Sequence, residues 1–443
     1  MTTRRRIVSS CLSAALCLGL CTIAPGAGAA EDLHASVAAQ YPELEKLFLE
    51  LHAHPELSMQ EFKTSDRLAA ELKAQGYDVT RKIGVTGLVG VMRNGTGPTV
   101  LIRADMDGLP VEEKTGLPYA SKARQVNLDG VDMPVMHACG HDVHVTALVG
   151  VARELRERKD EWHGTVMLLG QPAEESIGGA RAMVEDDLYG RVGRPDYALA
   201  FHVIAKYPAG KIAFSDGLMY SSADTVRIKV HGIATHGASP HLGRDPIVVA
   251  SEIVLALQTI VTREVSPIEP ALITVGAFHS GTAPNVISDI AVLDITVRAN
   301  TEATRALVLK SIERVALNTA RAAGLPEDKL PEVIAANEGV PTTTNDPALA
   351  RRVREAIRAQ MGDDAFAQWA QTDMGAEDFP ELVSVSPPIP SVYFEVGGTP
   401  QAVLDAGTWA DNHSPLFKID PEASIKSGVE AMTAAAIALL GKP

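Results

Sequence analysis

The chain has 443 residues, with 40 Lys and Arg against 55 Asp and Glu, and a formal net charge of −15 at pH 7. A chain this acidic is a poor nucleic-acid binder, because phosphates would repel it. Its length is enough for two or three domains with large cores, so it needs no disulfides for stability.

Residues 1–30 have the pattern of a signal peptide. Three arginines, Arg4–Arg6, precede a mostly apolar stretch, 7–23, that is too short for a stable membrane span, and small residues follow at 27–29. The arginines also resemble those of a twin-arginine signal, which exports folded proteins. No other run of about 18 apolar residues occurs. We therefore expect an exported, periplasmic protein without a membrane span.

Apolar residues at helical spacing predict helices over 37–51 and 64–75. The chain then alternates between helical stretches and short, continuously apolar runs. These runs are 99–102, 165–169, 197–201 and 391–394. Such strands are typical of a mainly parallel sheet covered by helices on both faces, so the sequence predicts an α/β catalytic domain.

The segment 218–337 has a different pattern, with the order β-α-β-β-α-β. The predicted elements are strands over 226–230, 271–276, 290–298 and 331–336, and helices over 246–264 and 302–323. This order is the split βαβ arrangement of ferredoxin-like α+β domains. We therefore predict a signal peptide at 1–30, a catalytic domain in two parts, 31–217 and 338–443, and an inserted domain between them at 218–337.

The stretch 136–144 reads MHACGHDVH and places Cys139 among three histidines and an aspartate. Cysteine, histidine and carboxylate side chains bind zinc-like divalent metals. The other three cysteines lie in the predicted signal peptide, so Cys139 would have no disulfide partner in the mature chain. An isolated cysteine is usually a small core residue. The neighbouring His141 and Asp142 favour a metal site instead.

Three predicted strands end directly before other candidate ligands. They are 99–102, followed by Asp105 and Asp107; 165–169, followed by Glu174 and Glu175; and 197–201, followed by His202. Ligands of open α/β sheets bind at the carboxyl ends of the strands, so these groups are expected to share one site.

Each of these residues also has a simpler interpretation. The pair Glu174–Glu175 could be the acidic first turn of a helix. His202 could be a hydrogen-bonded core histidine, and His413 could be an ordinary loop residue. Their joint placement at strand ends is what favours the shared site.

The residues described above, together with further motifs, give the chain a resemblance to the dinuclear-metal aminoacylase and carboxypeptidase family. It resembles most the branch of hippurate hydrolases, N-acetyl-amino-acid deacetylases and auxin-conjugate amidohydrolases. The motifs are HAHPELSMQE (52–61), RADMDGLP (103–110), MHACGHDVH (136–144), GQPAEE (170–175), AFHV (200–203), THGASPH (235–241), GTAPNVISD (281–289), GAEDF (375–379) and DNHSP (411–415). Ser288 departs from the proline common in the family.

The resemblance implies two divalent metal ions per subunit, drawn from zinc, manganese, nickel and cobalt. The implied ligands are Cys139, His141, Glu175, His202 and His413. Cys139 would bridge the two ions as a thiolate. Asp107 would orient a histidine ligand, and Glu174 would be the general base.

The inserted domain would contribute three further residues. In the family, a histidine equivalent to His236 stabilises the oxyanion in the partner subunit's active site, through a homodimer formed by the inserted domains. Asn285 and Arg298 would bind the substrate carboxylate, the arginine bidentately. The alternatives are a surface histidine and a solvent-facing strand arginine.

The implied activity is hydrolysis of the amide bond of N-acyl-amino acids by a metal-activated water, with Glu174 as base. A metallo-dipeptidase or carboxypeptidase using the same site is the close alternative. A third hypothesis is an exported binding protein for amino-acid conjugates, which would need no base beside the ligands. The acyl group and the amino acid are not readable from the sequence.

Overall fold

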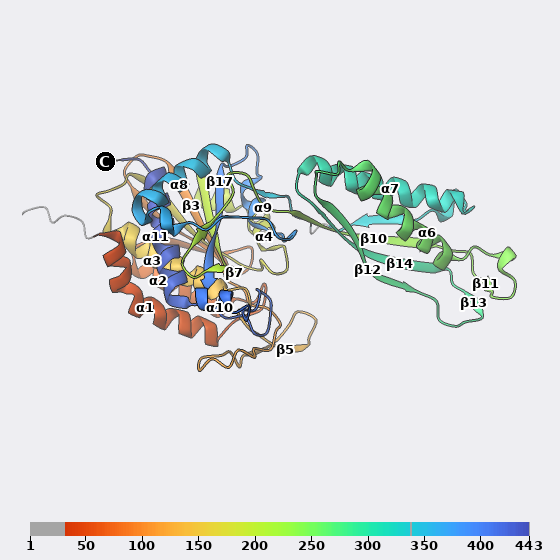
Figure 1. The fold of residues 1–443 in the computed structure, drawn as a ribbon, viewed down its shortest axis with the longest axis horizontal. Coiled ribbons are helices and arrows are strands. Elements are labelled where there is room, and N and C mark those ends of the chain that lie inside the picture. The colour runs from red at the N-terminus through yellow and green to blue at the C-terminus, as the bar shows by residue number, and fades with distance from the viewer. Residues whose placement is uncertain (1–31, 337–338, 443) are drawn as a thin grey trace, which may run out of the picture.

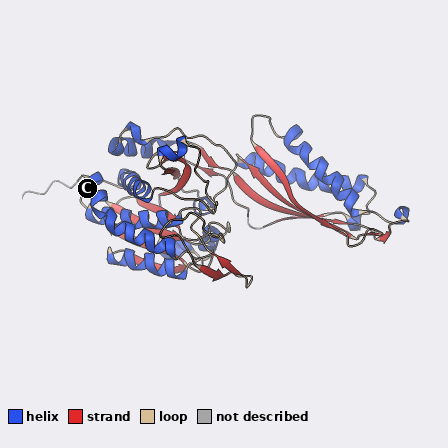
Figure 2. Ribbon diagram, turned by 60° about the horizontal axis from the view of Figure 1, so that its bottom comes forward, coloured by secondary structure: helices blue, strands red, loops and turns tan. Residues whose placement is uncertain are grey.

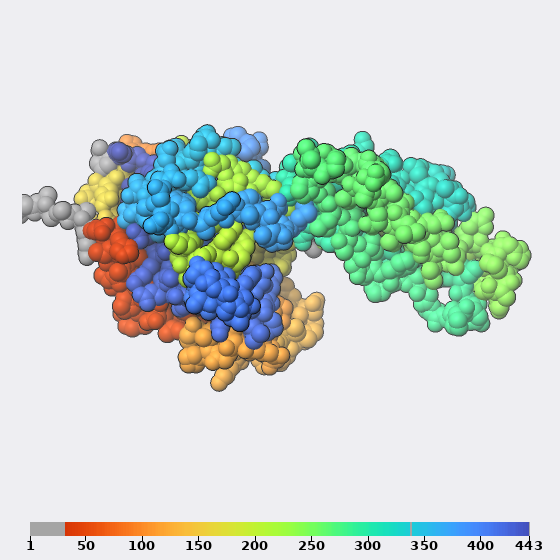
Figure 3. Space-filling view, viewed as in Figure 1, coloured from red at the N-terminus to blue at the C-terminus, as the bar shows by residue number. Residues whose placement is uncertain are grey.

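The computed structural model describes residues 32–336 and 339–442. The predicted signal peptide and its three cysteines lie outside the described residues. Figure 1 shows two lobes, and the lobe drawn in green is built from a single continuous stretch in the middle of the chain. Figure 3 shows a narrow connection between the lobes. We call them the catalytic lobe and the lid.

The catalytic lobe is built on a seven-stranded sheet in the order β1-β2-β6-β3-β7-β17-β8. The strands are β1 (Asp78–Ile83), β2 (Gly87–Asn94), β6 (Gly164–Gln171), β3 (Thr99–Asp105), β7 (Tyr197–Pro208), β17 (Ser391–Thr399) and β8 (Ile212–Ala213). The four middle strands run parallel and contain all four predicted strands. The predicted, mainly parallel sheet is therefore confirmed, with antiparallel strands added at its two edges.

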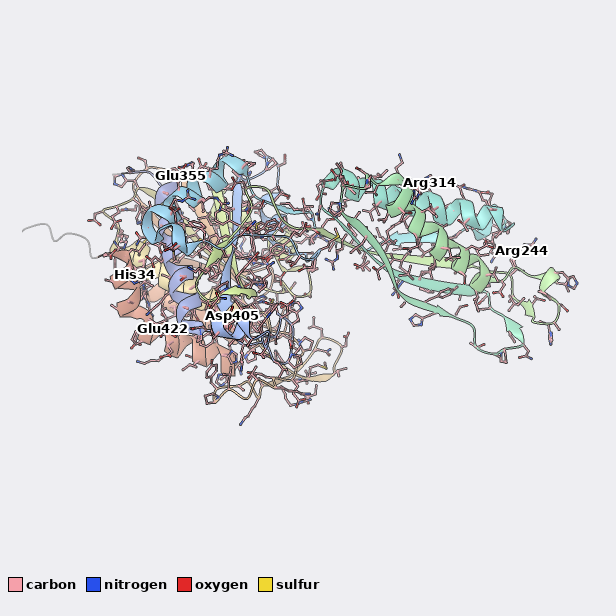
Figure 4. All side chains as sticks on the ribbon, viewed as in Figure 1. His34, Arg244, Arg314, Glu355, Asp405 and Glu422 are labelled. Atoms are coloured by element: carbon pink, nitrogen blue, oxygen red, sulfur yellow. The ribbon has the colours of Figure 1, made fainter. Side chains whose placement is uncertain are left out.

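Helices cover both faces of this sheet (Figure 2). The long ones are α1 (Leu33–Ala53), α2 (Phe62–Ala74), α3 (His141–Glu157), α8 (Pro347–Met361) and α11 (Pro421–Leu439). The short ones are α4 (Gly179–Glu185), α5 (Leu188–Val192), α9 (Phe379–Val383) and α10 (Gln401–Asp405). The predicted helices 37–51 and 64–75 correspond to α1 and α2. His34 of α1, labelled in Figure 4, contacts Glu430 of α11 at 3.1 Å and helps to join these two helices.

The lid has a four-stranded antiparallel sheet in the order β12-β14-β10-β15. Its elements are β10 (Ser222–His231), α6 (Pro246–Thr259) with a π-helical turn at Ile260–Glu264, β12 (Ala271–Ser280), β14 (Ile290–Ala299), α7 (Glu302–Ala322) and β15 (Glu332–Ala335). This is the predicted β-α-β-β-α-β order with the strand arrangement of a ferredoxin-like domain. All six elements lie within the predicted range 218–337.

Alternating burial explains how the lid sheet packs. Val226, Ile228 and Val230 are buried, whereas Arg227 is exposed, so one face of β10 contributes to the lid core. Both helices lie on one side of this sheet (Figures 1 and 2). By length and composition alone, the helix Pro246–Glu264 could cross a membrane, but this evidence is weak, because core helices pass the same test.

Small paired elements complete the described structure. They are the hairpin β4 (Arg124–Val126) with β5 (Asp132–Pro134), the pair β9 (Leu218–Tyr220) with β16 (Thr343–Thr344), and the pair β11 (Thr235–His236) with β13 (Val286–Ile287). The β9–β16 pair lies where the chain leaves and re-enters the catalytic lobe. Strand β16 thus lies in the segment that returns the chain from the lid to the catalytic lobe.

Candidate metal centre and active site

The candidate ligands gather at the carboxyl edge of the parallel strands. Glu174 and Glu175 follow β6, His202 lies in β7, and Cys139 and His141 lie at the start of α3. The loop that carries His413 is held against this edge, because the His413 N–H donates to Ala138 O at 2.7 Å. The structure therefore brings these residues together, although β7 continues to Pro208, so His202 lies inside its strand and not after it.

Gly140 is required between the two ligands of the MHACGHDVH loop. It has a φ of +83°, which is unfavourable for any residue with a side chain. A Cβ at this position would also lie only 2.2 Å from Cγ1 of Val203. The glycine thus allows Cys139 and the first residue of α3, His141, to approach β7 closely.

Two groups of candidate ligands share Cys139. The Cys139 Sγ lies 3.2 Å from Nε2 of His202 and 3.2 Å from Nε2 of His413. Ligand atoms of Cys139, His141 and His202 all lie within 4.8 Å of one another, and so do those of Cys139, Glu175 and His413. Two adjacent groups of three with one common thiol are the arrangement that a thiolate-bridged pair of metal ions requires.

Asp107 connects the histidine of one group to both glutamates. Its Oδ1 lies 3.4 Å from Nδ1 of His141, and its carboxylate accepts hydrogen bonds from the backbone N–H groups of Glu174 and Glu175, each at 3.1 Å. Ser58 donates to Asp107 Oδ2 at 2.6 Å. This geometry suits a residue that orients a ligand histidine, the role predicted for Asp107.

Hydrogen bonds distinguish His202 from His144. Nδ1 of His202 donates to the carbonyl of Val203 at 2.7 Å, which leaves Nε2 with a free lone pair on the cluster side. His144 uses both ring nitrogens: Nε2 accepts from the Val203 N–H at 2.8 Å, and Nδ1 donates to Asp105. His144 therefore has no ring nitrogen left for a metal.

The donor set fits divalent cations. Nε2 of His141 and Oε1 of Glu175 are buried and have no hydrogen-bond partner among the described residues. Burial and the nearby Glu175 and Glu174 hold the pKa of the Cys139 thiol well above its usual value. Burial also raises the pKa of Glu175 to about 7. Thiolate and carboxylate are the ligating forms, so this cluster needs the positive charge that metal ions supply.

The sequence argument missed a buried ionic network behind the cluster. Arg103 is 1% exposed, and its guanidinium contacts Asp105, Glu377 and Asp378. The hydroxyl of Tyr393 donates to Glu377 Oε2 at 2.5 Å. Four of these residues lie in the motifs RADMDGLP and GAEDF, two in each, but only folding reveals that the motifs pair with each other.

A cavity of about 790 Å³ opens over the cluster. Its wall includes Cys139, Glu174, Glu175, His202 and His413, together with Arg298 from the lid. Lys206, Tyr220 and Glu395 also line it, and no sequence motif points to these three residues.

The three lid residues predicted for the site lie in different places. Arg298 of β14 reaches the cavity wall. His236 and Asn285 lie at the β11–β13 pair, where the Gly237 N–H donates to Asn285 O at 2.7 Å. Figure 1 shows this pair at the end of the lid farthest from the catalytic lobe. Within one chain, neither residue is at the metal cluster.

Comparisons with known proteins show the family of this chain. Residues 101–438 match the peptidase family M20/M25/M40. The hippurate hydrolase of Campylobacter jejuni is 37% identical over 76% of this chain and 84% of its own length. Thermostable carboxypeptidase 1 of Saccharolobus solfataricus is 34% identical over 84% of this chain and 89% of its own length.

A solved structure also resembles this chain over most of its length. The crystal structure of a dinuclear metal binding peptidase from Bacillus subtilis has a TM-score of 0.74 and 29% identity, and the match covers 91% of this chain and 99% of that one. The resemblance that the motifs indicated is thereby confirmed. The chain belongs to peptidase family M20/M25/M40.

Proposed function

We propose that this protein is a metal-dependent amidohydrolase that cleaves N-acyl-amino acids into a carboxylic acid and a free amino acid. The observation that carries the proposal is the pair of ligand groups that share Cys139, with Glu174 beside them. The relatives named as hydrolases and peptidases support the same reaction class.

The proposed ligands are Cys139, His141, Glu175, His202 and His413. Divalent ions held there would acidify a water molecule and polarise the amide carbonyl. Zinc, manganese, nickel and cobalt are all compatible with a thiolate, imidazole and carboxylate set.

Glu174 is the proposed general base. Its Oε2 lies 3.8 Å from Nε2 of His141, so it borders the cluster without belonging to either group that contains Cys139. Burial, with Glu377 and Glu175 nearby, raises the pKa of Glu174 well above its usual value. It would take the proton of the attacking water and deliver it to the leaving nitrogen.

We propose that Arg298 binds the carboxylate of the amino-acid part. It lines the cavity, and among the described residues its guanidinium has no side-chain hydrogen bond or ion pair. We further propose a homodimer through the lids, in which His236 reaches the active site of a second copy and donates to the oxyanion. Asn285, beside His236 at the same end of the lid, would assist in substrate binding there.

Dipeptide hydrolysis at the same site is the second candidate, and the carboxypeptidase relative favours it. A protein that only binds amino-acid conjugates is a weaker candidate, because it gives no role to Glu174. We also propose export to the periplasm, on the pattern of residues 1–30 alone.

The test is a hydrolysis screen of the protein after metal removal and reloading with each metal in turn. The substrates are N-acetyl-, N-benzoyl- and N-indoleacetyl-amino acids and a set of dipeptides. We expect turnover of N-acyl-amino acids that disappears on chelation and returns with at least one metal. Turnover that persists in verified metal-free protein would refute the mechanism, and the absence of turnover with all four metals would refute the function.

A further inference from the structure

The cavity beside the metal cluster contains a buried glutamate that the proposed mechanism does not use. Glu395 is 1% exposed and lies in β17, between Phe394 and Val396, in a strand that is otherwise apolar or small. A carboxylate in a buried central strand is costly unless its oxygens have donors. We therefore expect each oxygen of the Glu395 carboxylate to accept a hydrogen bond.

Glu395 lies on the site side of the sheet. It is in register with His202 on the neighbouring strand β7, and it lines the same cavity. Successive side chains of a strand alternate between the two faces, so Glu395 shares a face with Tyr393, whose hydroxyl bonds to the site residue Glu377.

Only one of the two carboxylate oxygens has partners. Oε1 accepts from the Tyr220 hydroxyl at 3.0 Å and lies 3.3 Å from Nζ of Lys206. Oε2 has no hydrogen-bond partner among the described residues. Lys206 balances the charge of Glu395. The carboxylate therefore lacks only a hydrogen-bond donor to Oε2.

The position of the group indicates which part of the substrate it would meet. Arg298 reaches the cavity from the lid, and in the proposed function it binds the amino-acid carboxylate. Glu395 and Lys206 come from β17 and β7 of the catalytic lobe. The scissile carbonyl would lie over the cluster, so Glu395 is left to contact the acyl side.

We propose that Glu395 is a specificity residue that selects acyl groups bearing a hydrogen-bond donor, such as the amino group of an aminoacyl or aminoaryl substituent. This inference rests on the proposed function and narrows its substrate class. Tyr220 and Lys206 position the carboxylate. Plain alkyl and aryl acyl groups would leave Oε2 without a donor in the complex, and they would bind the transition state less well.

The test uses pairs of substrates with the same shape, in which an amino or ammonium group replaces a methyl group. Glycyl-leucine is compared with N-propionyl-leucine, and N-(4-aminobenzoyl)leucine with N-(4-methylbenzoyl)leucine, using the metal-loaded full chain. The measured quantity is the ratio of kcat/KM for the donor substrate to that for its partner. For one hydrogen bond to a charged group, we expect a ratio of about 10 to 100 in at least one pair.

Two variants then locate the effect. Glu395→Leu is expected to bring the ratio to about one, because neither substrate of a pair then meets a carboxylate. Glu395→Gln keeps the shape of the side chain and is expected to lower the ratio by about tenfold, and it decides the question if the leucine variant does not fold. Glu381→Gln, in a glutamate that pairs with Arg181 outside the cavity wall, is the control and should keep the wild-type ratio.

The outcomes separate this inference from the proposed function. If the wild-type protein cleaves none of the four substrates, the function itself is contradicted for these compounds. If it cleaves both members of each pair equally well, or if the Glu395 variants lose activity equally toward both members, the specificity role is wrong and the hydrolase function stands.

Discussion

In the catalytic lobe, Arg103 is 1% exposed and contacts three buried carboxylates. In the lid, Arg314, labelled in Figure 4, pairs with Glu264 while about half of its side chain remains exposed. The catalytic lobe thus holds the charges behind its metal cluster inside the protein, before any ligand binds. The lid keeps most of its charges in water and contributes to the site through single residues.

This difference suggests a division of work between the lobes. All five proposed ligands and Glu174 belong to the catalytic lobe, so metal binding should not depend on lid residues. The lid should instead affect substrate binding and the oxyanion. Four substitutions test this separation, and they are taken from the largest expected effect to the smallest.

Glu174→Gln should lower kcat by about 10²- to 10⁴-fold, because it removes the proton acceptor. Metal content, measured by elemental analysis, should not change, since Glu174 lies outside both groups that share Cys139. Glu381→Gln is the matched control and should keep normal activity. Full activity in the Glu174 variant would exclude it as the base.

Arg103→Met should destabilise the protein by about 3–5 kcal/mol, because it leaves buried carboxylates without their cation. Arg314→Met removes a partly exposed ion pair and should cost at most about 1 kcal/mol. Calorimetry of the two variants under identical metal loading gives the comparison. If both variants lose the same free energy of unfolding, the two arginines contribute equally to stability and the contrast between the lobes is wrong.

His236→Ala should lower kcat by about 10²- to 10³-fold, as does the loss of one oxyanion donor, with metal content unchanged. If His236 acts in the partner subunit, mixing this variant with Glu174→Gln should restore activity. Each hybrid dimer would have one complete site, so random re-pairing should give about one quarter of wild-type activity. Confirmed hybrid dimers without recovered activity would contradict the shared site.

Arg298→Lys should lower kcat/KM by about tenfold, mainly through KM, because lysine keeps the charge but loses the bidentate geometry. Arg227→Lys, in an exposed arginine of the same lid sheet that pairs with Asp294, is the control. If kcat/KM falls equally little in both variants, Arg298 does not bind the substrate carboxylate.

The sequence was sufficient to predict the residues at strand ends. Glu175 and His202 could be assigned to one site because parallel strands bring their carboxyl ends to the same edge, although β7 continues to Pro208 and His202 lies inside it. The partnership of Arg103 with Glu377 could not be predicted, because 274 residues separate them. The role of Glu395 was equally hidden, since its unpaired oxygen is a property of the packed site and not of the strand pattern.

The antiparallel edge of the main sheet was missed for a different reason. Strand β2 contains Gly90, and glycine weakens a strand pattern. In the structure, a Cβ on Gly90 would lie 2.9 Å from Cδ1 of Leu72 on α2, so the glycine permits the close packing of that helix on the sheet. Local propensity and tertiary packing favour different residues here, and packing prevails.

The insertion of the lid has a consequence for how the protein matures. His413 is separated by 274 residues from Cys139, the thiol common to both ligand groups, and the entire lid is synthesised between them. A growing chain therefore presents Cys139, His141, Glu175 and His202 long before the last ligand appears. The group of Cys139, Glu175 and His413 is complete only when the C-terminal segment has packed against the sheet. Metal retention would thus report that synthesis and folding are complete, and chains that stop early would lose their metal and their stability together.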